Sequence, residues 1–265
     1  MLSTTQSRWP PGADLHFHLL PGVDDGPTTM DESLELGQAA LWDGSGTLVA
    51  TPHVRPDFVT DVRELVERVR ELQAVLDAQG LPLLVRRGGE LGHDMVGRLD
   101  QEELEAIAQG PPGARWLLVE APFEGIGDDF HAATGELRER GFGVLVAHPE
   151  RSADASIDGS AGLRRELARG SLAQVNALSL TGDHGLEAEW AAMKLIGEGL
   201  VAVVGSDAHG AARPPAMTAA RRRLADHFPM ELARAEHRAV DRGLHASADS
   251  PTDVAKRCYS AVNYM

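Results

Sequence analysis

Histidines and acidic residues recur along this chain beside short apolar runs, where their side chains can bind metal ions. His16 and His18 form an HxH pair in the run DLHFHLL. Side chains two residues apart on a strand point to the same side, so both imidazoles can bind one ion. The other candidates follow the first run or end later ones: Asp25, His53, Glu90, Glu120, His148, Asp207 and His209. Mixed nitrogen and oxygen ligands suit Mn²⁺, Fe or Zn²⁺ better than Ca²⁺.

These candidates argue for a site more strongly as a set than one by one. A lone buried histidine is more often a satisfied core residue, and an acid at a strand end is often a helix cap. Here five of the 11 histidines lie on the first apolar run or shortly past a later one. The other histidines are expected in surface roles, with His93 and His131 near enough to reach the rim of the site. Asp24, beside Asp25 in GVDDG, is a weaker alternative to Asp25 as a ligand, and a turn residue is its expected role.

The elements that must position these residues alternate between short apolar runs and amphipathic stretches. Apolar residues repeat at three- and four-residue spacing over 61–79, which predicts a helix that Gly80 ends. Thr29 with Glu32 predicts a capping box at the start of another helix. A further helix is predicted over 188–196. The apolar runs that predict strands lie at 15–20, 47–50, 81–85, 116–119, 143–147, 172–175 and 200–204.

Strands and helices that alternate in this way predict a parallel sheet with crossover helices. So many strands in 265 residues indicate a closed or nearly closed α/β barrel. The carboxyl ends of barrel strands meet on one face, so the candidate ligands are expected to converge there. Residues 1–13 are expected to be an N-terminal extension, and residues 14–265 a single domain.

Composition limits the function further. The formal net charge of −15 argues against nucleic-acid binding, and it repels phosphate at long range. Phosphate chemistry would therefore need local positive charge, and divalent cations supply it. The single cysteine, Cys258, rules out an intrachain disulfide and fits a reducing cytoplasm. We expect no signal peptide and no membrane insertion, because no apolar stretch approaches the length of a span.

One resemblance is specific. Over residues 14–220 the chain resembles phosphatases of the PHP superfamily through HFH, LPGVDDG, ATPH, GGE, a strand-end Glu, AHPER, QVNALSLTG, GSDAH and ARPP, in this order. The DDGP after HFHLLPG, with HPER and SDAH, is similar to the protein-tyrosine phosphatases of bacterial capsule and exopolysaccharide synthesis. The match is loose in GHDMVGRLD after Glu90 and beyond Ala220, where loops are expected to shape substrate choice.

The resemblance implies a distorted TIM-like (β/α)7 barrel that binds three divalent metal ions, with Mn²⁺ favoured. It implies one ion at His16, His18, Glu90 and Asp207, a second at Glu90, Glu120 and His148, and a third at Asp25, His53 and His209. It also implies that Arg151 and Arg213 contact phosphate, with Arg55 a weaker candidate. The expected nucleophile is a water activated by metal, so no Ser, Cys or Asp nucleophile is needed.

The implied substrate is phosphotyrosine on an autophosphorylated bacterial tyrosine kinase, but three alternatives stay open. A related phosphatase could act on a small phosphate ester, such as histidinol phosphate or a nucleotide, with the same metals. An amidohydrolase also opens with HxH, but it commonly bridges two metals with a lysine that this chain lacks at a strand end. A PHP-like module could bind partners without catalysis, although such modules usually lose ligands. The sequence does not indicate an oligomeric state.

Overall fold

The computed structural model describes residues 12–59, 61–155 and 160–228. Its strands are β1 Gly12–Phe17, β2 Ser45–Ala50, β3 His53–Val54, β4 Leu84–Arg87, β5 Glu90–Leu91, β6 Trp116–Glu120, β7 Gly143–Ala147, β8 Leu172–Asn176 and β9 Val203–Gly205. Its helices are α1 Met30–Trp42, α2 Leu65–Ala78, α3 Gln101–Ile107, α4 Asp128–Glu139, α5 Ala161–Ala168, α6 Ala177–Thr181, α7 Leu186–Gly197 and α8 Met217–His227, with short 3₁₀ turns η1 Val62–Glu64, η2 His93–Arg98 and η3 Pro149–Arg151.

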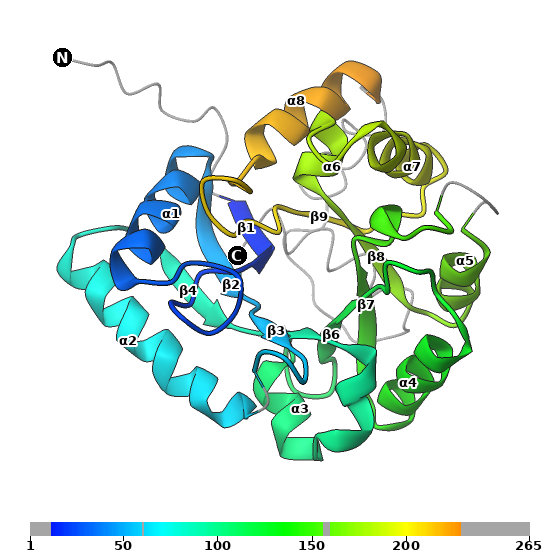
Figure 1. The fold of residues 1–265 in the computed structure, drawn as a ribbon, viewed down its shortest axis with the longest axis horizontal. Helices are drawn as coiled ribbons and strands as arrows, with labels where there is room; N and C mark the ends of the chain where they lie inside the picture. The colour runs from blue at the N-terminus through cyan, green and yellow to red at the C-terminus, as the bar shows by residue number, and fades with distance from the viewer. Residues whose placement is uncertain (1–11, 60, 156–159, 229–265) are drawn as a thin grey trace, which may run out of the picture.

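The strands form two parallel sheets, with the orders β1-β2-β4 and β3-β5-β6-β7-β8-β9. The chain crosses from the first sheet to the second at two places. There β2 continues into β3 and β4 continues into β5 after breaks of two residues. Their free edges also meet, since Phe17 forms a parallel bridge with Ala208 and the His18 N–H donates to the Ala208 carbonyl at 2.9 Å. Figure 1 shows the strands around a common centre with helices outside. The predicted TIM-like α/β barrel is confirmed, with its distortion at these breaks.

The helices follow the sequence signals closely. Thr29 and Glu32 form the predicted capping box at the start of α1, where the Thr29 side chain accepts from the Glu32 N–H. The predicted helix over 61–79 is present as η1 followed by α2, and Gly80 adopts a left-handed φ of 68° just beyond it. The helix predicted over 188–196 is α7. No helix in the described part of the chain is long and apolar enough to cross a bilayer.

The first strand lies earlier than predicted. β1 spans Gly12–Phe17, so it begins inside the expected extension and ends one residue before His18. The division into an extension and a single domain stays a prediction, since residues 1–11 and 229–265, with Cys258, lie outside the described residues.

Two apolar layers line the strands. The larger core packs one face of the strands, including Leu117, Val144 and Val146, against helical residues such as Leu72 and Leu104. Alternate residues of the same strands form a smaller cluster on the opposite face, with Leu118, Leu145 and Val203 as members. Glu120 lies two residues beyond Leu118 and therefore on this second face. The inner apolar layer thus lies beneath the carboxyl ends of the strands, where the polar site is found.

Candidate metal centre

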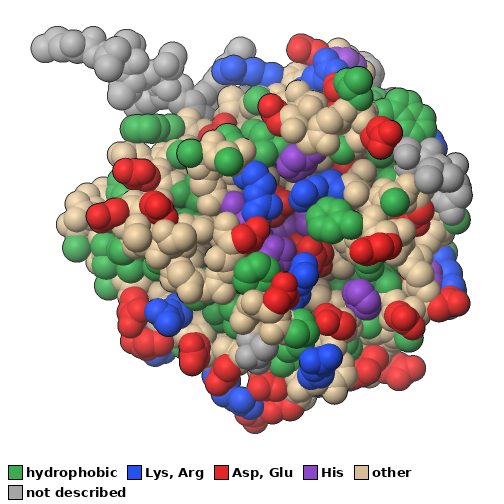
Figure 2. Space-filling view, viewed as in Figure 1, with side chains coloured by type: hydrophobic (Ala, Val, Ile, Leu, Met, Phe, Trp, Pro, Cys, Tyr) green, Lys and Arg blue, Asp and Glu red, His purple; other side chains and the backbone are tan. Residues whose placement is uncertain are grey.

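All the predicted ligands lie at the carboxyl ends of the strands. His16, His53, Glu90 and Glu120 belong to strands, and the others follow β1, β7 or β9. Figure 2 shows histidine, basic and acidic side chains gathered at the centre of this face. Three groups have ligand atoms within 4.8 Å of one another: His18, Asp25, His53 and His209; His16, Glu90, His148 and Asp207; and His53, Glu90 and Glu120.

The buried centre of the cluster brings four ligand atoms together. The Nε2 atoms of His16 and His18 are 3.3 Å apart. Each also lies 3.2–3.4 Å from Glu90 Oε2 and Asp207 Oδ1. Those two oxygens are buried and make no hydrogen bond within the described residues. A buried acceptor without a partner is costly, so this arrangement fits a bound cation.

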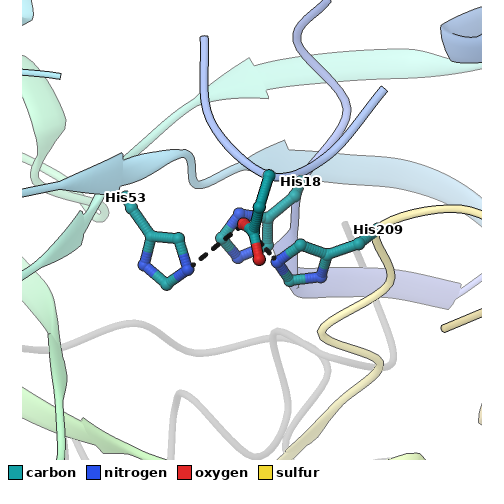
Figure 3. Close-up of side chains that lie close together, drawn as sticks. His18, His53 and His209 are labelled. Atoms are coloured by element: carbon teal, nitrogen blue, oxygen red, sulfur yellow. Dashed lines mark ion pairs between the residues drawn. The ribbon is translucent and has the colours of Figure 1, made fainter. Parts of the chain in front are cut away.

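A second group opens toward the surface. Asp25 Oδ1 lies 3.5 Å from His53 Nε2 and 3.2 Å from His209 Nε2. The rings of His18 and His209 stack with centroids 3.6 Å apart. Figure 3 shows the three imidazoles facing one another from β3, the end of β1 and the loop after β9. His209 Nε2 is buried without a hydrogen bond among the described residues, which again fits a cation.

Glu90 contacts histidines of different ligand groups. Its Oε1 is 2.8 Å from His148 Nε2, and its Oε2 is 3.0 Å from His53 Nδ1. Glu120 lies at the edge of the cluster, with Oε2 3.8 Å from His53 Nδ1. The grouping differs from the implied one, since His18 falls with the Asp25 group and His148 falls with His16. The assignment of ligands to individual ions therefore stays a prediction.

The pKa values show the site's need for positive charge. Burial lowers the pKa of His16, but the charges of Glu90 and Asp207 outweigh burial and raise it to about 9. Burial likewise lowers the pKa of His18, but the neighbouring carboxylates of Asp207, Asp24 and Glu90 outweigh burial and raise the pKa well above its ordinary value. Without cations, protonated His16 and His18 offset part of the carboxylate charge, whereas burial and the charge of His18 lower the pKa of His209 to about 4. Bound metal ions would supply the same positive charge.

Two of the predicted ligands adopt strained backbone conformations. His148 has a φ of 34° and Asp207 has a φ of 54°, in the left-handed region that non-glycine residues seldom adopt. Each lies just after a strand, at the turn that aims its side chain into the cluster. Such strain persists where the surrounding structure enforces it, and it is concentrated at functional sites.

Side chains behind the ligands orient them. Asp24 Oδ2 accepts from His18 Nδ1 at 2.6 Å and from the His53 N–H at 3.0 Å. Gln174 Oε1 lies 2.9 Å from His16 Nδ1, and Asn176 Nδ2 donates to Asp207 Oδ2 at 2.7 Å. The sequence interpretation missed these roles and considered Asp24 only as a turn residue or as a weaker alternative to Asp25 as a ligand. Polar residues at alternate positions of the apolar strand LAQVN, Gln174 and Asn176, were the available signal.

Three arginines surround the cluster, and each pairs with a predicted ligand. Arg151 Nη1 lies 3.1 Å from Asp207 Oδ2, and Arg213 Nη2 lies 2.6 Å from Asp25 Oδ2. Arg55 Nη1 lies 3.1 Å from Glu120 Oε2. The two arginines predicted to contact phosphate are therefore next to the site, and Arg55 occupies a comparable position on another side.

The remaining described histidines are His93, His131, His184 and His227, and the charges of Asp207 and His148 act on His184. His131 is buried and its Nδ1 bonds Glu166, so it does not reach the rim. His93 lines a cavity of about 260 Å³ with Phe130 and Pro122. His184, expected at the surface, is half-buried with Nδ1 3.0 Å from Ser179 Oγ. None of the three belongs to a ligand group.

The sequence matches a family model described as capsular polysaccharide synthesis, CpsB/CapC, over residues 12–236. The chain belongs to the CpsB/CapC family. Within it, the chain is 31% identical over 208 residues to the CapC protein of Staphylococcus aureus, covering 77% of this chain and 79% of that protein. It is 28% identical over 200 residues to the tyrosine-protein phosphatase YwqE of Bacillus subtilis, covering 74% and 76%.

The fold agrees with solved CpsB/CapC structures. A chain from the work on YwqE of Bacillus subtilis and CpsB of Streptococcus pneumoniae superposes with a TM-score of 0.76 at 26% identity. The match covers 86% of this chain and 92% of the other. Those proteins are described as metal-dependent tyrosine phosphatases. The predicted resemblance to the capsule-associated branch is confirmed.

Proposed function

We propose that this chain is a metal-dependent protein-tyrosine phosphatase. The observation that carries the proposal is the convergence of buried His, Asp and Glu ligand atoms, some without hydrogen-bond partners, beside three arginines. Membership of the CpsB/CapC family supports the same activity, because relatives in it are named tyrosine-protein phosphatases. The substrate we propose is phosphotyrosine on an autophosphorylated bacterial kinase of capsule or exopolysaccharide synthesis, in the cytoplasm.

The cofactor we propose is a cluster of three divalent cations, Mn²⁺ first and Fe or Zn²⁺ as alternatives. The ligands are the nine predicted residues, with the centre at His16, His18, Glu90 and Asp207. Nitrogen and oxygen donors of this kind bind these metals, whereas no thiolate is present in the groups. When bound, the cations polarise the phosphoryl group and lower the pKa of an attacking water.

The chain's own residues bind and orient the substrate. Arg151 and Arg213 offer planar guanidinium groups for the phosphoryl oxygens. Each guanidinium has five N–H donors, and its ion pair with Asp207 or Asp25 uses only some of them. The same donors stabilise charge that develops on the phosphoryl oxygens as the ester bond breaks.

A strong general acid is less necessary for this ester than for an alkyl phosphate. The tyrosine hydroxyl has an ordinary pKa of about 10, so its oxygen leaves as a fairly stable phenolate. Phosphoserine would leave as a much more basic alkoxide and would need a proton donor. Because phosphotyrosine does not require a proton donor for its leaving group, it is favoured over phosphoserine at this site.

The first test is phosphate release from a phosphotyrosyl peptide and from p-nitrophenyl phosphate, with Mn²⁺ and with a chelator. We expect activity with Mn²⁺ and its loss with chelator. His16→Ala and Asp207→Ala should each lower kcat/KM by more than about 100-fold, because loss of a ligand should exceed the effect of losing an outer-shell partner. His227→Ala is the matched control, since His227 is exposed on α8 and should leave activity unchanged.

Substrate comparison separates the alternatives. Faster hydrolysis of histidinol phosphate or a nucleotide than of phosphotyrosyl peptide would favour a small-molecule phosphatase. Metal binding without hydrolysis of any ester would favour a binding module. Full activity in His16→Ala, or activity that survives metal removal, would contradict the proposed site.

A further inference from the structure

Two exposed phenylalanine rings flank the candidate metal centre. Phe58 is 36% exposed and Phe123 is 48% exposed, although phenylalanine is usually buried. Phe58 stacks on His53 with centroids 5.3 Å apart and planes 19° apart. Phe123 lies nearly parallel to His148, with centroids 6.4 Å apart and planes 10° apart. Each ring therefore packs on a different predicted ligand and leaves part of its surface to solvent.

The imidazoles next to the two rings contact different oxygens of the same carboxylate. His53, under Phe58, contacts Glu90 through Oε2, and His148, under Phe123, contacts Glu90 through Oε1. The distances are 3.0 Å and 2.8 Å. When the phosphoryl group of an ester binds at the Glu90 centre, the organic group of the ester would thus have one phenylalanine ring on either side.

Backbone hydrogen bonds fix the segments that carry both rings. The Phe58 N–H donates to the Arg55 carbonyl at 3.1 Å, and the Val59 N–H donates to the His53 carbonyl at 3.2 Å. On the other side, the Ala153 N–H donates to the Phe123 carbonyl at 2.7 Å. Walls fixed before binding lose little entropy when a ligand enters.

An arginine guanidinium also lies near each ring. The Arg55 guanidinium carbon lies 6.0 Å from the Phe58 ring centre, and that of Arg151 lies 5.1 Å from the Phe123 ring centre. These same arginines pair with Glu120 and Asp207. Each phenylalanine ring is thus next to an arginine that is a candidate for binding phosphate, and Figure 2 shows hydrophobic and basic side chains near one another at the centre of this face.

We propose that Phe58 and Phe123 form an aryl-binding slot that makes the site selective for aromatic phosphate monoesters. This inference rests on the proposed phosphatase function and assigns it two specificity-determining residues. The phenol ring of phosphotyrosine would enter between the two walls, while its phosphoryl group binds the arginines. An alkyl phosphate such as phosphoserine offers no ring to stack and gains nothing from the slot.

The test compares ligands that share a charged head but differ in the ring. Phenylphosphonate, methylphosphonate and inorganic phosphate are titrated into the Mn²⁺-loaded full chain by calorimetry and used as inhibitors of p-nitrophenyl phosphate hydrolysis. We expect wild type to prefer phenylphosphonate to methylphosphonate. Phe58→Leu and Phe123→Leu should each reduce this preference by about three- to tenfold, because stacked aromatic pairs contribute on that scale.

The controls separate stacking from folding. Phe123→Trp should keep the preference, because it keeps an aromatic face. Trp42→Ala removes another exposed aromatic, 79% exposed and at the end of α1 that leads into β2, and should change nothing. Inorganic phosphate should bind wild type and both leucine variants equally.

Two results would overturn the slot. The first is a double leucine variant with the wild-type ratio between phenylphosphonate and methylphosphonate. The second is equal weakening of all three ligands, which would mean that the rings only support the imidazoles. The calorimetric ratio is measurable even if no ester is hydrolysed, so the slot and the proposed phosphatase function can fail separately.

Discussion

At the scale of single residues, the centre depends on side chains that do not belong to the ligand groups. Asp24 is the clearest case, because its carboxylate accepts from His18 Nδ1 and from the backbone N–H groups of Gly26 and His53. Burial raises the pKa of Asp24, but the bond with His18 outweighs burial and leaves the pKa below its ordinary value. An ionised Asp24 fixes His18 Nδ1 as a donor and leaves Nε2 directed to the cluster.

Asp24→Ala should weaken metal binding by about 10- to 100-fold, because it removes the group that orients His18. The measurement is the dissociation constant of Mn²⁺ from a calorimetric titration. Asp31→Ala, which removes an exposed acid in the first turn of α1, should leave the affinity unchanged. Unchanged affinity in Asp24→Ala would mean that neighbouring contacts already fix the imidazole.

At the scale of elements, α1 and α8 are linked by one carboxylate. Asp43, just after α1, accepts from the backbone N–H groups of Met217 and Thr218 at 2.6 and 3.1 Å. The cap residue Ala216 has no side-chain acceptor. Asp43, which is far from α8 in the sequence, therefore accepts the hydrogen bonds of free N–H groups in the first turn of α8. This contact fixes the start of α8, and the loop before it carries His209 and Arg213.

Asp43→Ala should lower the free energy of unfolding by about 1–2 kcal/mol, the usual effect of losing a helix cap. Urea unfolding measures it. Glu35→Ala, an exposed acid on α1, should cost less than about 0.5 kcal/mol. Equal effects in the two variants would show that solvent caps α8 as well as Asp43 does.

A second link joins α4 to α5. Glu166 on α5 is buried and accepts from Arg138 Nη1 and Ser171 Oγ, both at 2.9 Å, and it also pairs with His131. Burial raises the pKa of Glu166, but these hydrogen bonds outweigh burial and hold the pKa below its ordinary value of 4.5. The carboxylate is therefore charged at neutral pH and stabilises the fold there.

Glu166→Gln should lower the free energy of unfolding at pH 7 by about 1–3 kcal/mol, because it removes the charge that Arg138 pairs with and replaces one buried acceptor oxygen by an amide donor. A carboxyl group whose pKa is lowered by folding stabilises the fold at a pH above its ordinary pKa. This stabilisation is lost as the pH falls through the folded-state pKa. The difference between wild type and variant should therefore shrink below about pH 4.5. Glu67→Gln, in an exposed pair with Arg70, is the control and should show little difference at either pH. A difference that is constant with pH would contradict the assignment.

At the scale of the whole molecule, the site joins the barrel together. Its ligands come from β1, β3, β5 and β6 and from the segments after β1, β7 and β9, so a bound cation links both sheets. The chain as a whole is strongly acidic, with a formal net charge of −15. Cations at the centre relieve repulsion among its carboxylates and offset this charge where phosphate must bind.

Metal binding should therefore stabilise the folded chain. At a free Mn²⁺ concentration 100 times the dissociation constant, the gain should be about 2.7 kcal/mol. For a domain of this size that raises the midpoint of thermal unfolding by roughly 5–10 °C. Asp207→Asn should lose most of this rise, and chelator should reverse it in wild type. Identical midpoints with and without Mn²⁺ would argue against a metal centre in the barrel.

The sequence by itself determined the barrel and the residues that gather at its mouth. Strand periodicity and helix signals act locally, and parallel strands put their carboxyl ends on one face whatever the details of packing. His148 and Asp207 could therefore be placed near each other before any coordinates were known. The start of β1 was placed three residues late, because Gly12, Ala13 and Asp14 carry little strand signal of their own.

Only the tertiary structure decided how the site is assembled in detail. Gln174 orients His16 from 158 positions away, and Asp24 turns toward His18 instead of remaining in a simple turn. Phe58 and Phe123 give no pattern in the sequence that places them on ligand histidines. Such contacts depend on side-chain packing between segments far apart in the chain, and local periodicity carries no information about that packing.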